Sequence, residues 1–141
     1  MKRTASAVWS GDLKTGKGTM STQTGVLKDA RYGFASRFEE GPGSNPEELI
    51  GAAHAGCFSM AFSNELATAG HVPTSVATKA TVTLEFLDGG PTVTGVHLDC
   101  TAVVPGIDDA TFQTIAAGAK AACPISRLLN ATITLTAVLA S

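Results

Sequence analysis

The stretch NPEELIGAAHAGCFSMAF, residues 45–62, constrains the fold of this chain more strongly than any other. Asn45 is a suitable N-cap residue, and Glu48 completes a capping box with it. We therefore expect a helix from residue 46 to about residue 69. Residues 49–62 are apolar on nearly every side of that helix, so the helix should be buried on most of its sides.

The remaining strands and helices are predicted from the alternation of apolar and polar residues and from turn residues. Segments rich in Val and Thr predict strands at residues 4–9, 74–87 and 92–104 and in the final ATITLTAVLA, with further strands joined by glycine turns within residues 11–27. Further helices are expected at residues 109–121, capped by Asp108, and at CPISRLL, with Pro124 in its first position. Because no repeat or linker interrupts this order, we expect a single domain over residues 1–141 of the α+β class.

The composition points to an oligomer. Of the 141 residues, 44% are hydrophobic and only 16% are charged, so a domain of this size has apolar surface left to cover. We expect a homo-oligomer with a large apolar interface. The net charge is −2 and no cluster of Lys and Arg occurs, which argues against nucleic acid and anionic membranes as partners.

The cysteines and the apolar segments indicate the compartment. MKRTASAVWSG has no apolar region after its basic start, and the longest apolar stretch is too short to span a bilayer. Three cysteines without a CxxC spacing do not resemble a secreted disulfide framework. We expect a cytoplasmic protein, and no His and Cys spacing fits a metal site.

Cys57 is either a packing residue or a reactive thiol. It lies about a dozen residues into the long helix, beyond the reach of the helix dipole. Apolar burial alone would raise the pKa of its thiol and keep it inert. A reactive Cys57 therefore needs a cation from outside the helix, and Arg37 is the candidate. Residue types alone favour the structural role.

Cys123 directly precedes Pro124 and occupies the N-cap position of the short helix, where backbone N–H groups favour a thiolate. A small core residue at a turn is its alternative role. Cys100 lies in a strand with no cap or cation nearby, and we interpret it as packing. His54 precedes Cys57 by three residues, so a cysteine hydrolase is another alternative, although no third orienting residue is evident.

Glu47 has two interpretations as well. It suits the positive end of the helix dipole, as Glu48 does. One of the two could instead hold the Arg37 guanidinium in a bidentate pair within an apolar pocket.

Several blocks of the chain together resemble a known family. RFEEGPGSNPEELIGAAHAGCFSMA, VPGID and ACPIS are similar to the OsmC/Ohr family of thiol-dependent peroxidases that act on organic hydroperoxides, and most similar to its osmotically inducible (OsmC) branch. The position of Arg37, shortly before the helix, is the mark of that branch. The resemblance implies an intertwined α+β homodimer, with central buried helices wrapped by antiparallel sheets.

The resemblance also implies roles for four residues. Cys57 would be the peroxidatic cysteine, Cys123 the resolving cysteine, and Arg37 and Glu47 the ion pair of the active site. The Cys57 thiolate would attack the peroxide and become a sulfenic acid, and Cys123 would convert it to a disulfide. An external dithiol similar to dihydrolipoamide would then reduce that disulfide, with no metal or organic cofactor. The implied role in the cell is defence against oxidative and osmotic stress.

Helix geometry adds one expectation of its own. Glu47 lies ten residues before Cys57, which on an unbroken helix is ~15 Å along the axis. We therefore expect the Arg37–Glu47 pair to reach Cys57 from the partner subunit, unless Gly51 or Gly56 kinks the helix.

Four apolar side chains are candidates to line a pocket that favours bulky hydroperoxides, and some of the four must be core residues instead: Phe38, Phe58, Met60 and Phe62. The alternative to an enzyme is an OsmC-like module that binds a hydrophobic ligand in such a pocket without catalysis.

Overall fold

The structure is a computed structural model that describes all 141 residues. The chain forms two compact units, Met1–Leu49 and Ile50–Ser141. Helix α2 (Pro46–Thr68) begins in the first unit and continues into the second. The single domain expected from the sequence stays a prediction.

The first unit contains a three-stranded antiparallel sheet. Its strands β1 (Ala5–Ser10), β2 (Lys17–Thr22) and β3 (Ala30–Tyr32) lie in the order β1-β2-β3 and are followed by helix α1 (Phe34–Phe38). The Trp9 and Tyr32 rings lie 5.4 Å apart, centroid to centroid, over Gly18. A Cβ atom at Gly18 would come within 2.4 Å of the Tyr32 ring, so this position requires glycine. Strand β3 and helix α1 were not predicted.

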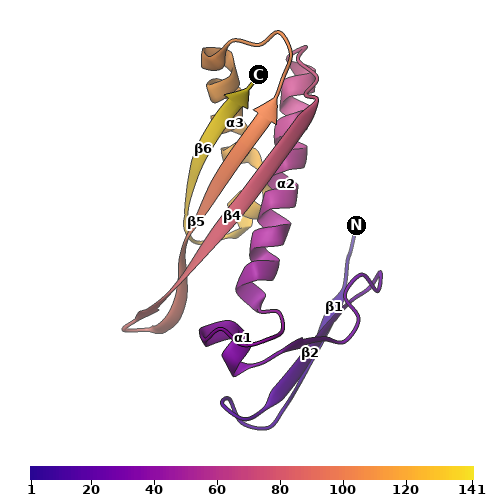
Figure 1. Cartoon of the computed structure of the whole chain (residues 1–141), viewed down its shortest axis with the longest axis vertical. Helices are drawn as coiled ribbons and strands as arrows, with labels where there is room; N and C mark the ends of the chain where they lie inside the picture. The colour runs from indigo at the N-terminus through magenta and orange to yellow at the C-terminus, as the bar shows by residue number, and fades with distance from the viewer. The chain divides into compact units, whose positions relative to one another are not determined.

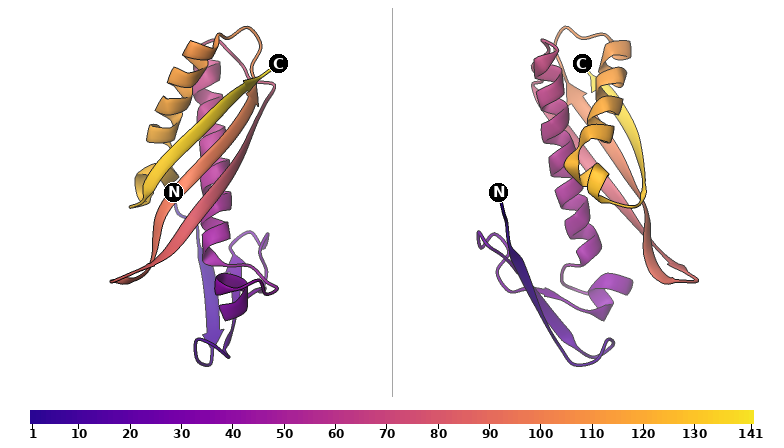
Figure 2. Two further views of the ribbon diagram at one scale, coloured as in Figure 1. Left: turned by 60° about the vertical axis from the view of Figure 1, so that its left-hand side comes forward. Right: turned by 180° about the vertical axis from the view of Figure 1, so that it is seen from behind.

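The second unit packs helices on a second three-stranded sheet. Its elements after α2 are β4 (Ser75–Leu87), β5 (Gly90–Val103), α3 (Asp109–Ala122), α4 (Pro124–Leu128) and β6 (Thr132–Ala140). The strands lie in the order β4-β5-β6, and α2 and α3 lie on the same face of this sheet (Figures 1 and 2). The predicted bounds of α2, α3 and these strands agree with the structure to within two residues.

The expectation of purely antiparallel sheets is wrong for β6. Strand β4 pairs with β5 antiparallel, but β5 pairs with β6 parallel, from Gly95↔Thr132 to Val103↔Ala140. The connection between β5 and β6 contains α3 and α4, and such a helical crossover returns the chain to the end of the sheet from which β5 started. Both helices were predicted from the sequence, but the direction of the last strand was not.

Helix α2 buries one face rather than most of its sides. Its buried residues recur at helical spacing: Gly51, His54, Phe58, Phe62 and Leu66. Met60, on another side of the helix, is 77% exposed. The structure describes one chain, and the apolar side of α2 that carries Met60 is uncovered in it. The homodimer expected from the sequence stays a prediction.

Three phenylalanine rings form the centre of the core in the second unit. Phe62 lies 5.6 Å from Phe58 and 5.2 Å from Phe112, ring centroid to ring centroid, and all three side chains are fully buried. Phe58 and Phe62 are therefore core residues, as the sequence analysis expected for some of the four candidate pocket residues. No helix of the structure combines the length and the hydropathy needed to cross a bilayer.

The start of α2 confirms the N-cap but not the capping box. The Asn45 Oδ1 atom accepts a hydrogen bond from the Glu48 backbone N–H at 2.8 Å. The Glu48 carboxylate accepts from the Ser44 hydroxyl at 3.3 Å instead of completing a capping box with Asn45. Helix α3 begins as predicted, with Asp108 accepting from the Thr111 backbone N–H at 2.8 Å.

Candidate active site

Cys57 and Cys123 meet in the second unit although 66 positions separate them in the sequence. Their sulfur atoms lie 3.1 Å apart, and both are free thiols in the structure. Cys123 is fully buried, whereas Cys57 is half-buried. A short rearrangement would bring the two sulfurs to the ~2.05 Å separation of a disulfide.

Cys123 is placed by the junction of two helices. Its backbone N–H donates to Ala119 O at 2.9 Å and ends α3, while its carbonyl accepts from Arg127 N at 3.0 Å and starts α4. Pro124 follows as the first residue of α4, as the sequence predicts. The thiol therefore stands at the N-cap of α4, where it faces Cys57 on α2.

The two thiols experience opposite influences. Burial raises the pKa of Cys57, and the neighbouring Cys123 raises it further, with the Ile125 backbone N–H opposing them. Burial also acts to raise the pKa of Cys123, but the backbone N–H of Ser126, then Cys57 and the backbone N–H of Ile125, outweigh it, so that this pKa is lowered. No Lys or Arg is among the groups that act on Cys57. Activation of Cys57 therefore needs a cation from elsewhere.

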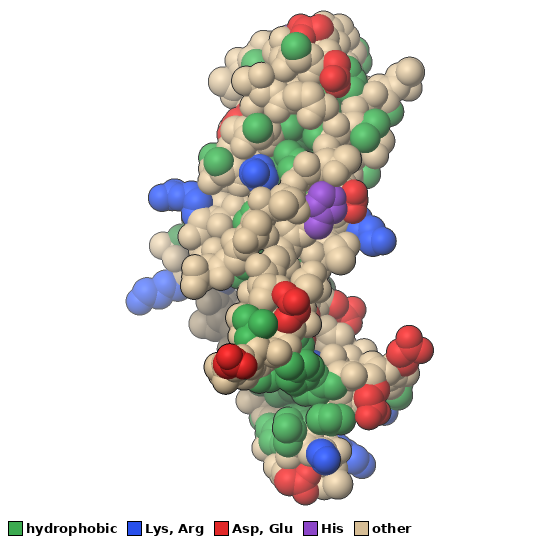
Figure 3. Space-filling model, turned by 90° about the vertical axis from the view of Figure 1, so that its left-hand side faces the viewer, with side chains coloured by type: hydrophobic (Ala, Val, Ile, Leu, Met, Phe, Trp, Pro, Cys, Tyr) green, Lys and Arg blue, Asp and Glu red, His purple; other side chains and the backbone are tan.

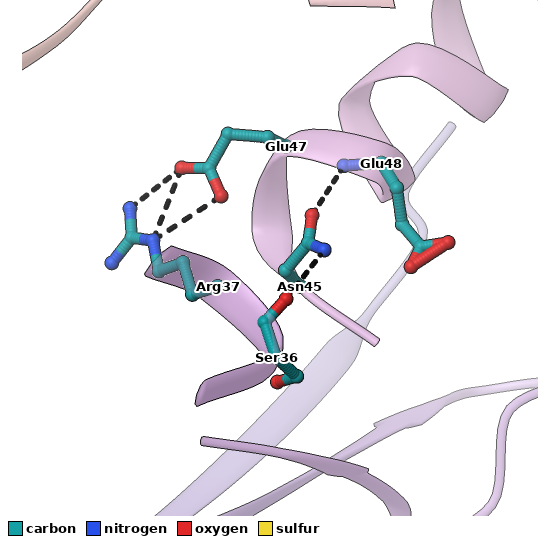
Figure 4. Close-up of polar contacts among 5 residues, drawn as sticks. All are labelled: Ser36, Arg37, Asn45, Glu47 and Glu48. Atoms are coloured by element: carbon teal, nitrogen blue, oxygen red, sulfur yellow. Dashed lines mark hydrogen bonds and ion pairs between the residues drawn. The ribbon is translucent and has the colours of Figure 1, made fainter. Parts of the chain in front are cut away.

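Arg37 and Glu47 form a bidentate ion pair in the first unit (Figure 4). Arg37 Nη2 lies 2.7 Å from Glu47 Oε1, and Arg37 Nε lies 3.2 Å from both carboxylate oxygens. The Arg37 guanidinium also lies over the Phe38 ring, 5.2 Å from its centroid. The side chain of Glu47 is 12% exposed and that of Arg37 35%, so the acid is well shielded and the cation stays accessible.

A cap contact ties this pair to the start of α2. Asn45 Nδ2 donates to Ser36 O at 3.0 Å, which joins α1 to the residue that caps α2 (Figure 4). Of the two candidate acids, Glu47 pairs with Arg37, while Glu48 bonds to Ser44. Helix α2 runs through Gly51 and Gly56 without interruption.

Comparison with known proteins identifies the family of this chain. Residues 39–138 match the family described as OsmC-like protein. The chain is 55% identical over 129 residues to the peroxiredoxin OsmC of Escherichia coli, covering 92% of this chain and 90% of that protein. The chain belongs to the OsmC family.

More distant members extend this relationship. The OsmC-family chain is 33% identical over 105 residues to the organic hydroperoxide resistance protein of Xanthomonas axonopodis, covering 71% of this chain and 69% of that protein. An OsmC-like protein from Vibrio cholerae shares the fold with a TM-score of 0.78 at 16% identity, over 98% of this chain and 99% of that one. The organic hydroperoxide resistance protein OhrB of Bacillus subtilis does so with a TM-score of 0.68 at 22% identity, over 97% and 98%.

His54 is hydrogen-bonded to Ser126 and not to Cys57, which a cysteine hydrolase would require. Its Nε2 atom lies 2.7 Å from the Ser126 hydroxyl oxygen, and it is fully buried. Ser126, three residues after Cys123, was not singled out in the sequence analysis. Its spacing from Cys123, which is the spacing from N-cap to N3 in a helix, is the signal that could have found it.

The remaining candidates lie apart from the cysteine pair. Cys100 is buried on β5, and burial raises the pKa of its thiol, as expected for a packing residue. A cavity of about 690 Å³ in the first unit is lined by cationic side chains, Lys14, Lys17 and Arg31, as well as by apolar ones such as Val8 and Phe34. On the face drawn in Figure 3, the Lys and Arg side chains are spread out and form no continuous patch. The expected absence of metal and nucleic acid stays a prediction.

Proposed function

We propose that this OsmC-family chain is a cysteine-based peroxidase that reduces organic hydroperoxides to alcohols. The observation that carries the proposal is the 3.1 Å approach of the Cys57 and Cys123 sulfurs. The substrate class is supported by the relatives named organic hydroperoxide resistance protein, and the reaction by the relative named peroxiredoxin OsmC.

Cys57 is the peroxidatic residue in this proposal because it is the more accessible of the two thiols. Its thiolate attacks the outer peroxide oxygen, the O–O bond breaks, and the alkoxide leaves as an alcohol after taking one proton. Cys57 is thereby oxidised to a sulfenic acid. The Cys123 sulfur then attacks the Cys57 sulfur, and a disulfide forms as one water is released. An external dithiol, similar to dihydrolipoamide, reduces the disulfide by exchange.

Arg37 supplies the cation that Cys57 lacks within its own unit. We assign the Arg37–Glu47 pair to the site of the partner subunit in a homodimer, because Glu47 and Cys57 are ten residues apart on a continuous helix. Glu47 holds the guanidinium in place, and the guanidinium stabilises the thiolate and polarises the peroxide. Phe38, beside Arg37, favours the organic part of the substrate. The proposed setting is cytoplasmic defence against oxidative and osmotic stress.

The test is one turnover of the reduced protein. Reduced protein is mixed with one equivalent of cumene hydroperoxide, and intact mass and peptide linkage are measured. We expect a loss of two hydrogens and a bridge between Cys57 and Cys123. Cys100→Ser is the matched control and should form the same bridge, because Cys100 is buried in the core and has no partner sulfur.

Two variants separate the roles. Cys57→Ser should not consume peroxide, and Cys123→Ser should consume one equivalent and then accumulate sulfinic acid on Cys57 when peroxide is in excess. Unchanged mass in the native protein, with both thiols free, would contradict the proposal and favour the non-catalytic binding module.

A further inference from the structure

His54 is a fully buried polar side chain with only half of its hydrogen-bonding capacity used. Its Nε2 atom bonds to the Ser126 hydroxyl at 2.7 Å, while its Nδ1 atom is buried without any partner. Leaving a buried polar atom unpaired costs free energy, so apolar packing alone does not explain a histidine here. His54 is also not used by the peroxidase mechanism set out above.

Ser126 connects His54 to the reacting sulfurs. Its hydroxyl and its backbone N–H both act on the Cys123 thiol and lower its pKa, and the Cys123 sulfur lies 3.1 Å from the Cys57 sulfur. A line of groups therefore runs from the His54 imidazole to the Ser126 hydroxyl, which it contacts, and from there to Cys123, three residues before Ser126 at the start of α4, and to its neighbour Cys57. Three separate segments supply it, namely the middle of α2, the end of α3 and the first turn of α4.

We propose that Ser126 and His54 form a proton relay that takes the thiol proton of Cys123 as this residue attacks the sulfenic acid of Cys57. The proposal rests on the proposed peroxidase function and deepens it by assigning residues to its second step. In this proposal Ser126 takes the proton from the reacting thiol, while His54 acts through Ser126 and is a positioning residue in this sense.

The second step moves one proton along this line and forms one S–S bond. The Cys123 thiol passes its proton to the Ser126 oxygen, and the Ser126 hydroxyl proton moves to His54 Nε2. The Cys123 sulfur attacks the Cys57 sulfur, the S–S bond forms, and the S–O bond of the sulfenic acid breaks. Hydroxide leaves and is neutralised by the proton that His54 gives back, so each disulfide releases one water. Cys123 supplies the electron pair of the new bond, and the Cys57 sulfur is reduced from the sulfenic to the disulfide level.

The surroundings of His54 suit this role. Burial lowers the pKa of His54, so the imidazole is neutral near pH 7 and has a lone pair for the proton. The titratable groups along the line are His54, Cys123 and Cys57, and no Asp, Glu, Lys or Arg is among the groups that act on them. No carboxylate near His54 therefore competes for the proton.

The experiment measures the two steps separately. Reduced protein is mixed rapidly with cumene hydroperoxide. Sulfenic acid on Cys57 is trapped with dimedone, and disulfide formation is followed by quenching and intact mass. Ser126→Ala keeps the backbone N–H but removes the hydroxyl. We expect it to slow disulfide formation about 100-fold, the lower end of general acid–base catalysis, while sulfenic acid still forms. Ser126→Thr, which keeps a hydroxyl, should restore most of the rate.

The His54→Gln variant tests whether the side chain at position 54 must take up a proton. Glutamine can donate a hydrogen bond to Ser126, but it cannot take up a proton at neutral pH. In the native protein the disulfide step should slow as the pH falls through the pKa of His54, and in His54→Gln this dependence should be absent. Ser59→Ala is the matched control. Ser59 lies on the same helix as His54, but its hydroxyl bonds to Thr78 on β4 at 2.7 Å, so its removal should not affect either step.

The outcomes are distinguishable. Native disulfide rates and a native pH profile in Ser126→Ala would overturn the relay alone, even if His54→Gln failed to fold. Failure of the native protein to form sulfenic acid would overturn the peroxidase function, and the relay together with it.

Discussion

At the scale of single residues, the two cysteines differ more than their contact suggests. Cys57 has a raised pKa and some exposure, whereas Cys123 is buried and has a lowered pKa. In the isolated chain the more acidic thiol is therefore the one that substrate does not reach. This order suits the resolving step, because Cys123 is ready as a nucleophile once Cys57 is oxidised. It also explains why the first step depends on an outside cation.

The buried His54 imidazole should make the free energy of unfolding depend on pH. Burial lowers its pKa in the folded state below the ordinary value of 6.5, so the unfolded chain takes up the proton first as the pH falls. The unfolded state then binds more protons, and the free energy of unfolding falls as the pH drops below about 6.5, by at most about 1.4 kcal/mol per pH unit.

Urea unfolding of the reduced protein between about pH 7.5 and 5.5, at one protein concentration, measures this effect. We expect the native protein to lose more stability over this range than His54→Gln, which has no titrating group at position 54. Equal losses in the two proteins would show that the His54 pKa is not lowered.

At the scale of elements, local signals predicted most of what surrounds the cysteines. The Asn45 cap, the Asp108 cap and Pro124 at the start of α4 fixed where α2, α3 and α4 begin. These signals work because each depends on residues within one helical turn.

Features that depend on distant residues could not be predicted in the same way. The parallel pairing of β6 depends on the path of a crossover, and the contact between His54 and Ser126 joins residues 72 positions apart. The burial of α2 on one side only depends on what covers the helix, which its own sequence does not contain. The pairing of Cys57 with Cys123 was available from family resemblance alone.

The start of α2 supports a prediction at this scale. Asn45→Ala should lower the free energy of unfolding by about 1 kcal/mol, because it removes the cap on the Glu48 N–H and the bond to Ser36 O. Asn64→Ala makes the same substitution at an exposed position of α2 and should be neutral or slightly stabilising. Denaturant unfolding of both variants measures the difference, and equal stabilities would contradict the capping role.

At the scale of the whole molecule, the proposed site combines a pair at the start of α2 with a pair at its middle. The Arg37–Glu47 pair belongs to the first unit and the cysteine pair to the second. The matched family region begins at residue 39, after Arg37, so the arginine lies outside the part that defines the family. In such a site the cation is held before the helix and the thiol lies in its middle. A second copy of the chain would complete the site by bringing its cation to this thiol.

Mixing inactive variants tests this arrangement. Arg37→Ala and Cys57→Ser, each strongly impaired alone, are unfolded and refolded together. If arginine and cysteine come from different subunits, mixed dimers contain one intact site, and peroxidase activity should return to about a quarter of the native value. Cys57→Ser mixed with Cys123→Ser is the control and should stay inactive, because these cysteines meet within one chain. No recovery in the first mixture would place the arginine in the same chain as its cysteine.

The contact between Cys57 and Cys123 also ties the catalytic cycle to the strength of the fold. A bond between residues 66 positions apart would enclose nearly half of the chain, including all of β4, β5 and α3. Restricting the unfolded chain by a loop of this length stabilises the folded state by about 4 kcal/mol. An oxidised molecule waiting for its reductant would then be its most heat-resistant form, and each reduction would loosen it again. Resistance to heat or protease would therefore record how far the supply of peroxide exceeds the supply of dithiol.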